Sequence, residues 1–71
     1  MYPNVRAEFA RKNLTLEKAV EALKGLGFSM TIATLSQKLN GKYPITFDEA
    51  KAIKKITGTD IPLEELFEEA S

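Results

Sequence analysis

The chain contains no cysteine and no histidine, and each absence excludes a class of chemistry. Without them there are no disulfides, no thiolate nucleophile, no zinc site built on sulfur or imidazole, and no serine-histidine-aspartate triad. No apolar run approaches the roughly 18 residues of a membrane helix, and residues 1–6 lack the apolar stretch of a signal peptide. We therefore expect a cytoplasmic protein that uses no cofactor and does not enter a membrane.

The length of 71 residues limits the chain to one small domain, which we expect to span residues 1–71. With 44% apolar and 28% charged residues, the composition is that of a globular protein. Such a short chain has little room for a substrate cleft, and the neighbouring carboxylates Asp48 and Glu49 would point to different sides of a helix. We therefore expect neither an enzyme nor a small-molecule substrate.

The formal net charge is zero, but the charges are divided unevenly along the chain. All ten basic residues lie within residues 6–55 beside five acidic ones, which leaves this part at +5. Residues 57–71 hold five acidic residues and no basic one. A basic body suits a polyanionic partner such as nucleic acid, although an acidic end is also a common solubilising feature.

Apolar residues recur at helical spacing throughout, and almost no segment alternates as a strand does. We expect an all-α fold, a compact bundle of about five short helices. The first helix should cover about residues 4–12. The others should begin at residues suited to N-caps, namely Thr15, Thr31, Thr46 and either Thr59 or Asp60. Thr46 and Glu49 stand in capping-box spacing, which makes that helix start the clearest of the five.

Residues 14–42 have the organisation of a helix-turn-helix: a short helix, a glycine-containing turn, and a second short helix with small and polar side chains on its exposed side. In such a unit the first helix braces the second, which enters the DNA major groove. The groove is about 12 Å wide, so bulky side chains on the entering face would keep the helix out. The unit therefore indicates a DNA-binding domain.

Particular segments carry a more specific similarity. They read Leu-Thr-Leu-Glu-Lys-Ala-Val over residues 14–20, Thr-Leu-Ser-Gln-Lys-Leu-Asn-Gly-Lys-Tyr-Pro over residues 34–44, and Thr-Phe-Asp-Glu-Ala over residues 46–50. Together with Leu-Glu-Glu-Leu-Phe at residues 63–67, they resemble the Cro/CI (Xre-type) helix-turn-helix regulators of phages and prophages. The resemblance implies a lambda-repressor-like domain, sequence-specific binding to double-stranded operator DNA, transcription regulation, for example as a repressor, and action as a homodimer.

The resemblance also implies roles for residues in and around the helix expected over residues 31–40. Base-edge contacts fall to Thr31, Ile32, Ala33, Ser36 and Gln37. The side-chain amide of Gln37 can form a bidentate pair with adenine, and Ile32 or Ala33 can touch a thymine methyl. A second interpretation of Ile32 is burial against the preceding helix. Phosphate contacts fall to Thr15, Lys38, Asn40, Lys42 and Tyr43.

The chain departs from the family pattern in the turn between these two helices, which is about five residues longer than usual. Residues 24–29 form this enlarged turn. Its apolar residues Leu26 and Phe28, with Met30 just beyond, either tuck under the turn as additional core or form an exposed patch for a partner protein.

The sequence leaves the partner open in two respects. Leu63, Leu66 and Phe67 of the last helix either cap the core of the monomer or supply a dimer contact. A helix-turn-helix fold can also lose DNA binding and retain a partner surface, and the apolar Ile32 and Ala33 at reader positions permit that. The alternative function is therefore a protein-interaction module without DNA binding. RNA has less support, because the site offers one aromatic side chain for base stacking.

Overall fold

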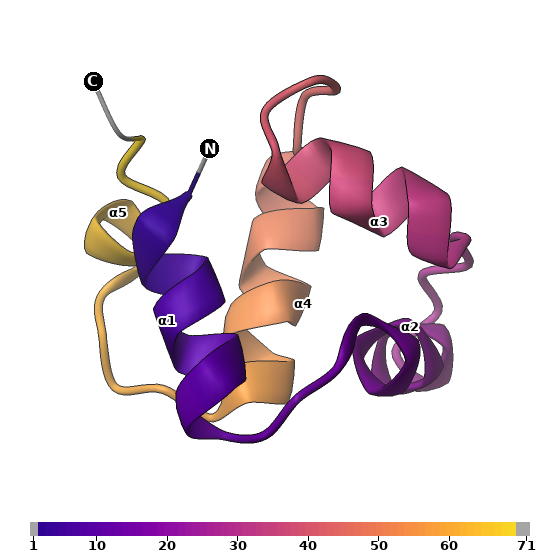
Figure 1. The fold of residues 1–71 in the computed structure, drawn as a ribbon, viewed down its shortest axis with the longest axis horizontal. Helices are drawn as coiled ribbons and strands as arrows, with labels where there is room; N and C mark the ends of the chain where they lie inside the picture. The colour runs from indigo at the N-terminus through magenta and orange to yellow at the C-terminus, as the bar shows by residue number, and fades with distance from the viewer. Residues whose placement is uncertain (1, 70–71) are drawn as a thin grey trace.

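The computed structural model describes residues 2–69 and arranges them in five helices joined by turns and short loops (Figure 1). The helices are α1 (Pro3–Arg11), α2 (Leu16–Gly25), α3 (Ile32–Leu39), α4 (Phe47–Thr57) and α5 (Leu63–Leu66). Residues 2–69 contain no strand, so the all-helical fold expected from the sequence is confirmed. Over the same residues, none of the helices has both the length and the apolar character needed to cross a membrane.

Threonine hydroxyls begin three of the helices, as the sequence predicts. The hydroxyl oxygens of Thr15, Thr31 and Thr46 each accept a hydrogen bond from the backbone N–H three residues later, at 3.1, 3.1 and 3.2 Å. Each such cap contributes about 1 kcal/mol to helix stability. At the start of α4 the capping box is complete, because the backbone N–H of Thr46 donates to Oε1 of Glu49 at 3.0 Å.

Four of the helices also end alike, each just before one residue in the left-handed conformation. These residues are Asn13 (φ 55°), Gly27 (φ 90°), Gly41 (φ 83°) and Gly58 (φ 66°). After α2, the N–H of Gly27 donates to the carbonyl of Lys24 (3.0 Å), and the N–H of Phe28 donates to that of Leu23 (2.9 Å). This is the Schellman arrangement, which satisfies carbonyls of the last turn and reverses the chain sharply. It closes α2 before the enlarged turn leads into α3.

Two of the three apolar residues in and just after the enlarged turn pack against the core. Phe28 and Met30 are half-buried and pack against the core cluster, as one of the two sequence interpretations predicts. Leu26 does not follow them: it is the C-cap of α2 and is 38% exposed. The core interpretation is wrong for this residue because the chain reverses directly after it, at Gly27, and leaves its side chain outside the turn.

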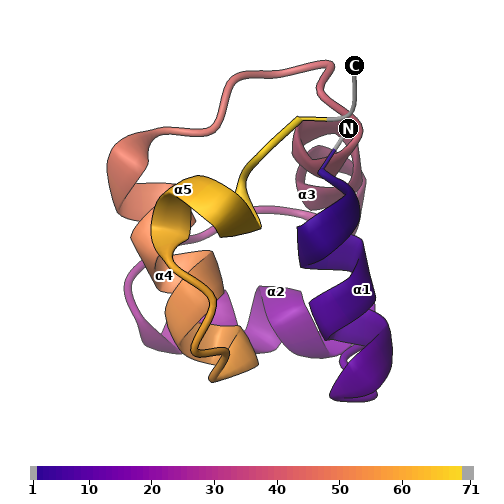
Figure 2. The same ribbon diagram turned by 90° about the vertical axis from the view of Figure 1, so that its left-hand side faces the viewer.

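The core lies where all five helices meet. Its buried apolar residues are Val5, Phe9, Ala19, Leu23, Leu35, Leu39, Ala50, Ala52, Ile53 and Leu66. α2 packs against α3 and α4, whereas α5 packs against α4 and α1. α4 stands in the middle in Figure 1, with α1 and α5 on one side and α2 and α3 on the other. In the turned view of Figure 2, α4 and α1 lie at opposite sides and α5 lies in front of α4.

The two ends of the described chain differ from the sequence predictions. α1 begins at Pro3 and ends at Arg11, one residue earlier at each end than predicted. The predicted N-cap of α5 at Thr59 or Asp60 is wrong, because that helix starts only at Leu63, after Pro62. Thr59 is buried, and its hydroxyl instead accepts a hydrogen bond from the N–H of Ile61 at 3.2 Å. The hydroxyl therefore stabilises the connecting turn rather than the helix.

Candidate nucleic-acid interface

α3, the helix expected to read DNA, lies at one end of the longest axis of the molecule (Figure 1). Leu35 and Leu39 hold it in place, because both are buried in the core as predicted. The threonine cap fixes its first turn, and the left-handed Gly41 fixes the exit of the chain. The orientation of α3 is therefore set by its apolar side, and its other side faces outward.

The residues predicted to contact bases fall into two groups. Thr31, Ile32 and Ala33 at the start of α3 are exposed, whereas Ser36 and Gln37 one turn later are half-buried. Ile32 is 45% exposed, so its predicted burial against the preceding helix is not found. The outward surface of α3 thus begins with one polar, one large apolar and one small side chain and continues into two polar ones.

The hydroxyl of Thr31 is already engaged within α3. It accepts from the backbone N–H of Thr34 and donates to Oγ1 of the same residue at 2.9 Å. The hydroxyl of Thr31, a residue predicted to contact bases, therefore stabilises the first turn of α3.

Lys38 makes a contact that the sequence pattern does not predict. Its Nζ donates to Oε2 of Glu49 on α4 at 2.5 Å, and the two side chains are only 16% and 14% exposed. Burial by itself would raise the pKa of Glu49, but the hydrogen bonds from Lys38 and from the backbone of Thr46 outweigh burial and lower the pKa below its ordinary value. The pair ties the last turn of α3 to the first turn of α4.

Asn40, just after α3, is tied to α1. A terminal guanidinium nitrogen of Arg6 donates to Oδ1 of Asn40 at 2.5 Å. This contact brings a cation from the beginning of the chain to the end of α3. Arg6 is a candidate for phosphate contact that sequence reasoning missed.

The remaining predicted phosphate contacts lie at exposed positions. Lys42 and Tyr43 are exposed in the loop after α3, and Tyr43 is 51% exposed. Thr15 is exposed at the start of α2, where its hydroxyl serves as the N-cap. The structure thus gathers Arg6, Lys38 and Lys42 around the exit of α3, with Thr15 on the neighbouring helix.

The acidic end of the described chain lies away from this surface. Residues 60–69 contain five carboxylates, and they run with α5 along the side of the molecule opposite α2 and α3 (Figure 1). The outward side of α3 is therefore not covered by the acidic segment. Within residues 2–69 no three acidic side chains gather into a group that would hold a metal ion.

The two contacts missed by sequence reasoning have no local signal. Arg6 and Asn40 are 34 positions apart, and Lys38 and Glu49 are 11 apart on different helices. Glu49 already had a sufficient role in the capping box, so nothing in its spacing indicated a second partner. Comparison of the chain with models of known protein families, with curated proteins and with solved structures found no match.

Proposed function

We propose that the chain binds double-stranded DNA sequence-specifically, as a cytoplasmic transcription regulator of the Cro/CI type, with α3 in the major groove. The observation that carries the proposal is the exposed start of α3, formed by Thr31, Ile32 and Ala33. The acidic segment of residues 60–69 does not cover α3 (Figure 1). A helix presented in this way can enter the groove with its first turn leading.

The side chains on this face suit such an entry. Ala33 and Ser36 are small, so the helix axis can come close to the base edges. Gln37 offers a donor and an acceptor in one planar group, which matches the adenine edge. Ile32 offers an exposed apolar surface for a thymine methyl. Thr31 would contribute by fixing the leading turn.

Phosphate contacts would come chiefly from the loop after α3. Lys42 and Tyr43 are exposed there, and Arg6 stands beside Asn40 at the same exit. Thr15 would contact the backbone from the exposed start of α2. Lys38 has a smaller role, because Glu49 already neutralises its charge.

A homodimer is part of the proposal. One small domain contacts few base pairs, so an operator of useful length requires two copies on half-sites about one helical turn apart. Leu66 is buried and Phe67 packs edge-on against Tyr2, so these side chains cap the monomer core. We therefore expect the two copies to assemble on the operator, at a stoichiometry that sedimentation of the complex will measure.

A protein-interaction module remains the second candidate, and two observations favour it. The ammonium of Lys38 is paired with Glu49, which removes one cation from the proposed DNA face. The exposed side of the neighbouring α2 carries the carboxylates of Glu17 and Glu21. Both features reduce the positive potential that a DNA-binding surface needs.

Selection of bound sequences from a pool of random DNA duplexes tests the proposal. We expect one enriched motif with two-fold symmetry, together with binding to random duplex that falls steeply as salt rises. No enriched motif, with negligible binding even at low salt, would favour the protein-interaction module.

A matched pair of variants links any binding to α3. The control is Lys55→Ala, because Lys55 is exposed and lies near the far end of α4. Ala33→Glu and Lys55→Ala each lower the net charge by one. We expect Ala33→Glu to abolish binding and Lys55→Ala to retain it, whereas equal losses would show that α3 is not the interface.

A further inference from the structure

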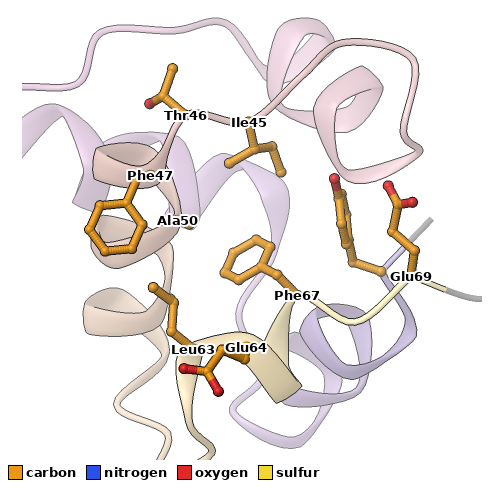
Figure 3. Close-up of a pocket in the computed structure, with 9 residues that line it drawn as sticks. Ile45, Thr46, Phe47, Ala50, Leu63, Glu64, Phe67 and Glu69 are labelled. Carbon is orange, nitrogen blue, oxygen red and sulfur yellow. The ribbon is translucent and has the colours of Figure 1, made fainter.

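A groove of about 770 Å³ lies between the start of α4 and α5, and no residue of α3 is among those that line it (Figure 3). Its apolar surface comes from Ile45, Phe47, Leu63 and Phe67, with Ala50 at its base on α4. We refer to it as the α4–α5 groove. Phe47 is 67% exposed, a high value for so large an apolar side chain. An exposed aromatic ring beside an apolar hollow is typical of a docking site.

Contacts at one edge of the α4–α5 groove hold its walls in place. The rings of Tyr2 and Phe67 meet edge to face, with their centroids 5.4 Å apart. On the same side, Nδ2 of Asn4 donates to the carbonyl of Glu65 at 2.7 Å and fastens α5 to α1. The groove therefore exists before any partner arrives, which reduces the ordering cost of binding.

The charges that line the groove are all negative. Glu64 and Glu69 are its lining carboxylates, and no basic residue is among its lining residues. Burial and, after it, the nearby Glu69 raise the pKa of Tyr2, in keeping with an anion at this edge. The Nζ of Lys51, one helical turn after Phe47, stands 5.0 Å from the centroid of the Phe47 ring, but Lys51 is not among the lining residues.

This charge pattern disfavours a second copy of the chain as the occupant. A two-fold contact brings the same patch of both copies face to face. Glu64 and Glu69 of both copies would then enter one interface, and burial of like charges is costly. A partner that brings cations to the rim avoids this cost.

We propose that the α4–α5 groove docks a cationic amphipathic segment of another protein. Leucine or aromatic side chains of that segment fill the space between Phe47, Leu63 and Phe67, and lysine or arginine side chains pair with Glu64 and Glu69. No residue of α3 is among the lining residues, so the segment would leave the outward start of α3 uncovered. The proposal does not depend on DNA binding.

Selection from a displayed library of random peptides, each long enough for about four helical turns, tests the proposal. The wild-type chain is the target, and the Phe47→Asp variant is used to remove peptides that bind elsewhere. Phe47 is so exposed that its substitution leaves the fold intact, which thermal unfolding will verify. We expect peptides enriched in leucine or aromatic residues together with lysine or arginine.

The affinities of the enriched peptides for variants of the chain then show whether the peptides bind in the α4–α5 groove. We expect Phe47→Asp and Glu64→Lys each to weaken binding about tenfold or more, and Leu26→Asp, a change of another exposed apolar residue, to have no effect. Failure to enrich any peptide, enrichment of acidic peptides, or equal binding to the Phe47→Asp variant would overturn the proposal. A wild-type chain that sediments as a dimer without DNA, and becomes monomeric on Phe47→Asp, would show that a second copy fills the groove instead.

Discussion

Lys38 and Glu49 join α3 to α4 through an ion pair in which both side chains are largely shielded from water. The same carboxylate also accepts the backbone N–H of Thr46, so one side chain begins α4 and positions the end of α3. The angle between α3 and α4 therefore depends on this ion pair. The loop of residues 40–46 alone would not fix that angle.

Removal of Lys38 should destabilise the fold more than removal of a neighbouring exposed lysine. Lys38→Ala leaves the Glu49 carboxylate shielded without its cation, and we expect a loss of about 1–3 kcal/mol in unfolding free energy. Lys42→Ala, at an exposed position, should stay within about 0.5 kcal/mol of wild type. Urea unfolding measures both. Equal effects of the two substitutions would contradict a structural role for the pair.

The free energy of unfolding should decrease as the pH becomes acidic. Since the pKa of Glu49 is lowered in the native state, that state binds fewer protons than the unfolded chain. Its contribution is complete above the ordinary carboxyl pKa and is lost as the pH falls through the lowered native value. Glu8 acts in the same direction, because hydrogen bonds from Arg11 and then Thr59 lower its pKa.

We therefore expect the thermal unfolding midpoint to be flat near neutral pH and to fall below about pH 5. Glu49→Gln should reduce this fall and leave the part due to Glu8. Circular dichroism melts across the pH range measure the effect. A variant that loses as much stability in acid as the wild type would exclude Glu49 as a contributor.

Two glycines at the end of α2 should respond oppositely to alanine. Gly27 has a φ of 90°, so Gly27→Ala should cost about 1–2 kcal/mol. Gly25 is the last residue of the helix and has open space where an alanine Cβ would lie, so Gly25→Ala should be neutral or stabilise by up to about 1 kcal/mol. Chemical denaturation of the two variants makes the comparison, and a stabilised Gly27→Ala would contradict the Schellman assignment.

Lys42 should contribute to DNA binding through charge alone. Lys42→Ala should weaken binding to all duplexes alike and reduce the slope of log affinity against log salt by about one. Lys55→Ala is the matched control, since Lys55 is also exposed but lies near the far end of α4. Fluorescence anisotropy at several salt concentrations gives both slopes. An unchanged slope for Lys42→Ala would remove it from the interface.

Gln37 should act on specificity rather than on general affinity. Gln37→Ala should cost about 1–3 kcal/mol on the selected motif and little on random duplex. Competition between the two DNAs measures the ratio directly. Equal weakening on both would show that Gln37 does not read a base.

The features that were predicted correctly depend on residues that lie close together in the sequence. Each correct helix start depends on a hydroxyl and an N–H three residues apart, and each correct core assignment depends on helical spacing. The cap predicted for α5 was wrong because Thr59 can satisfy a nearby turn equally well, and spacing does not distinguish the two.

Contacts between distant segments could not be predicted in this way. The pairs Arg6 with Asn40 and Lys38 with Glu49 exist only after the helices have packed. The α4–α5 groove is a further example, because its lining residues come from both ends of the described chain and from the start of α4.

The contact between Tyr2 and Phe67 brings the beginning and the end of the described chain to the same edge of the α4–α5 groove. A tag or reporter attached at Tyr2 or at Glu69 would therefore stand beside the groove and compete with a docking peptide. Since the sequence contains no cysteine, one cysteine introduced at the exposed Lys24 would provide a unique attachment point on α2. Immobilisation through that point would leave the groove open to a peptide.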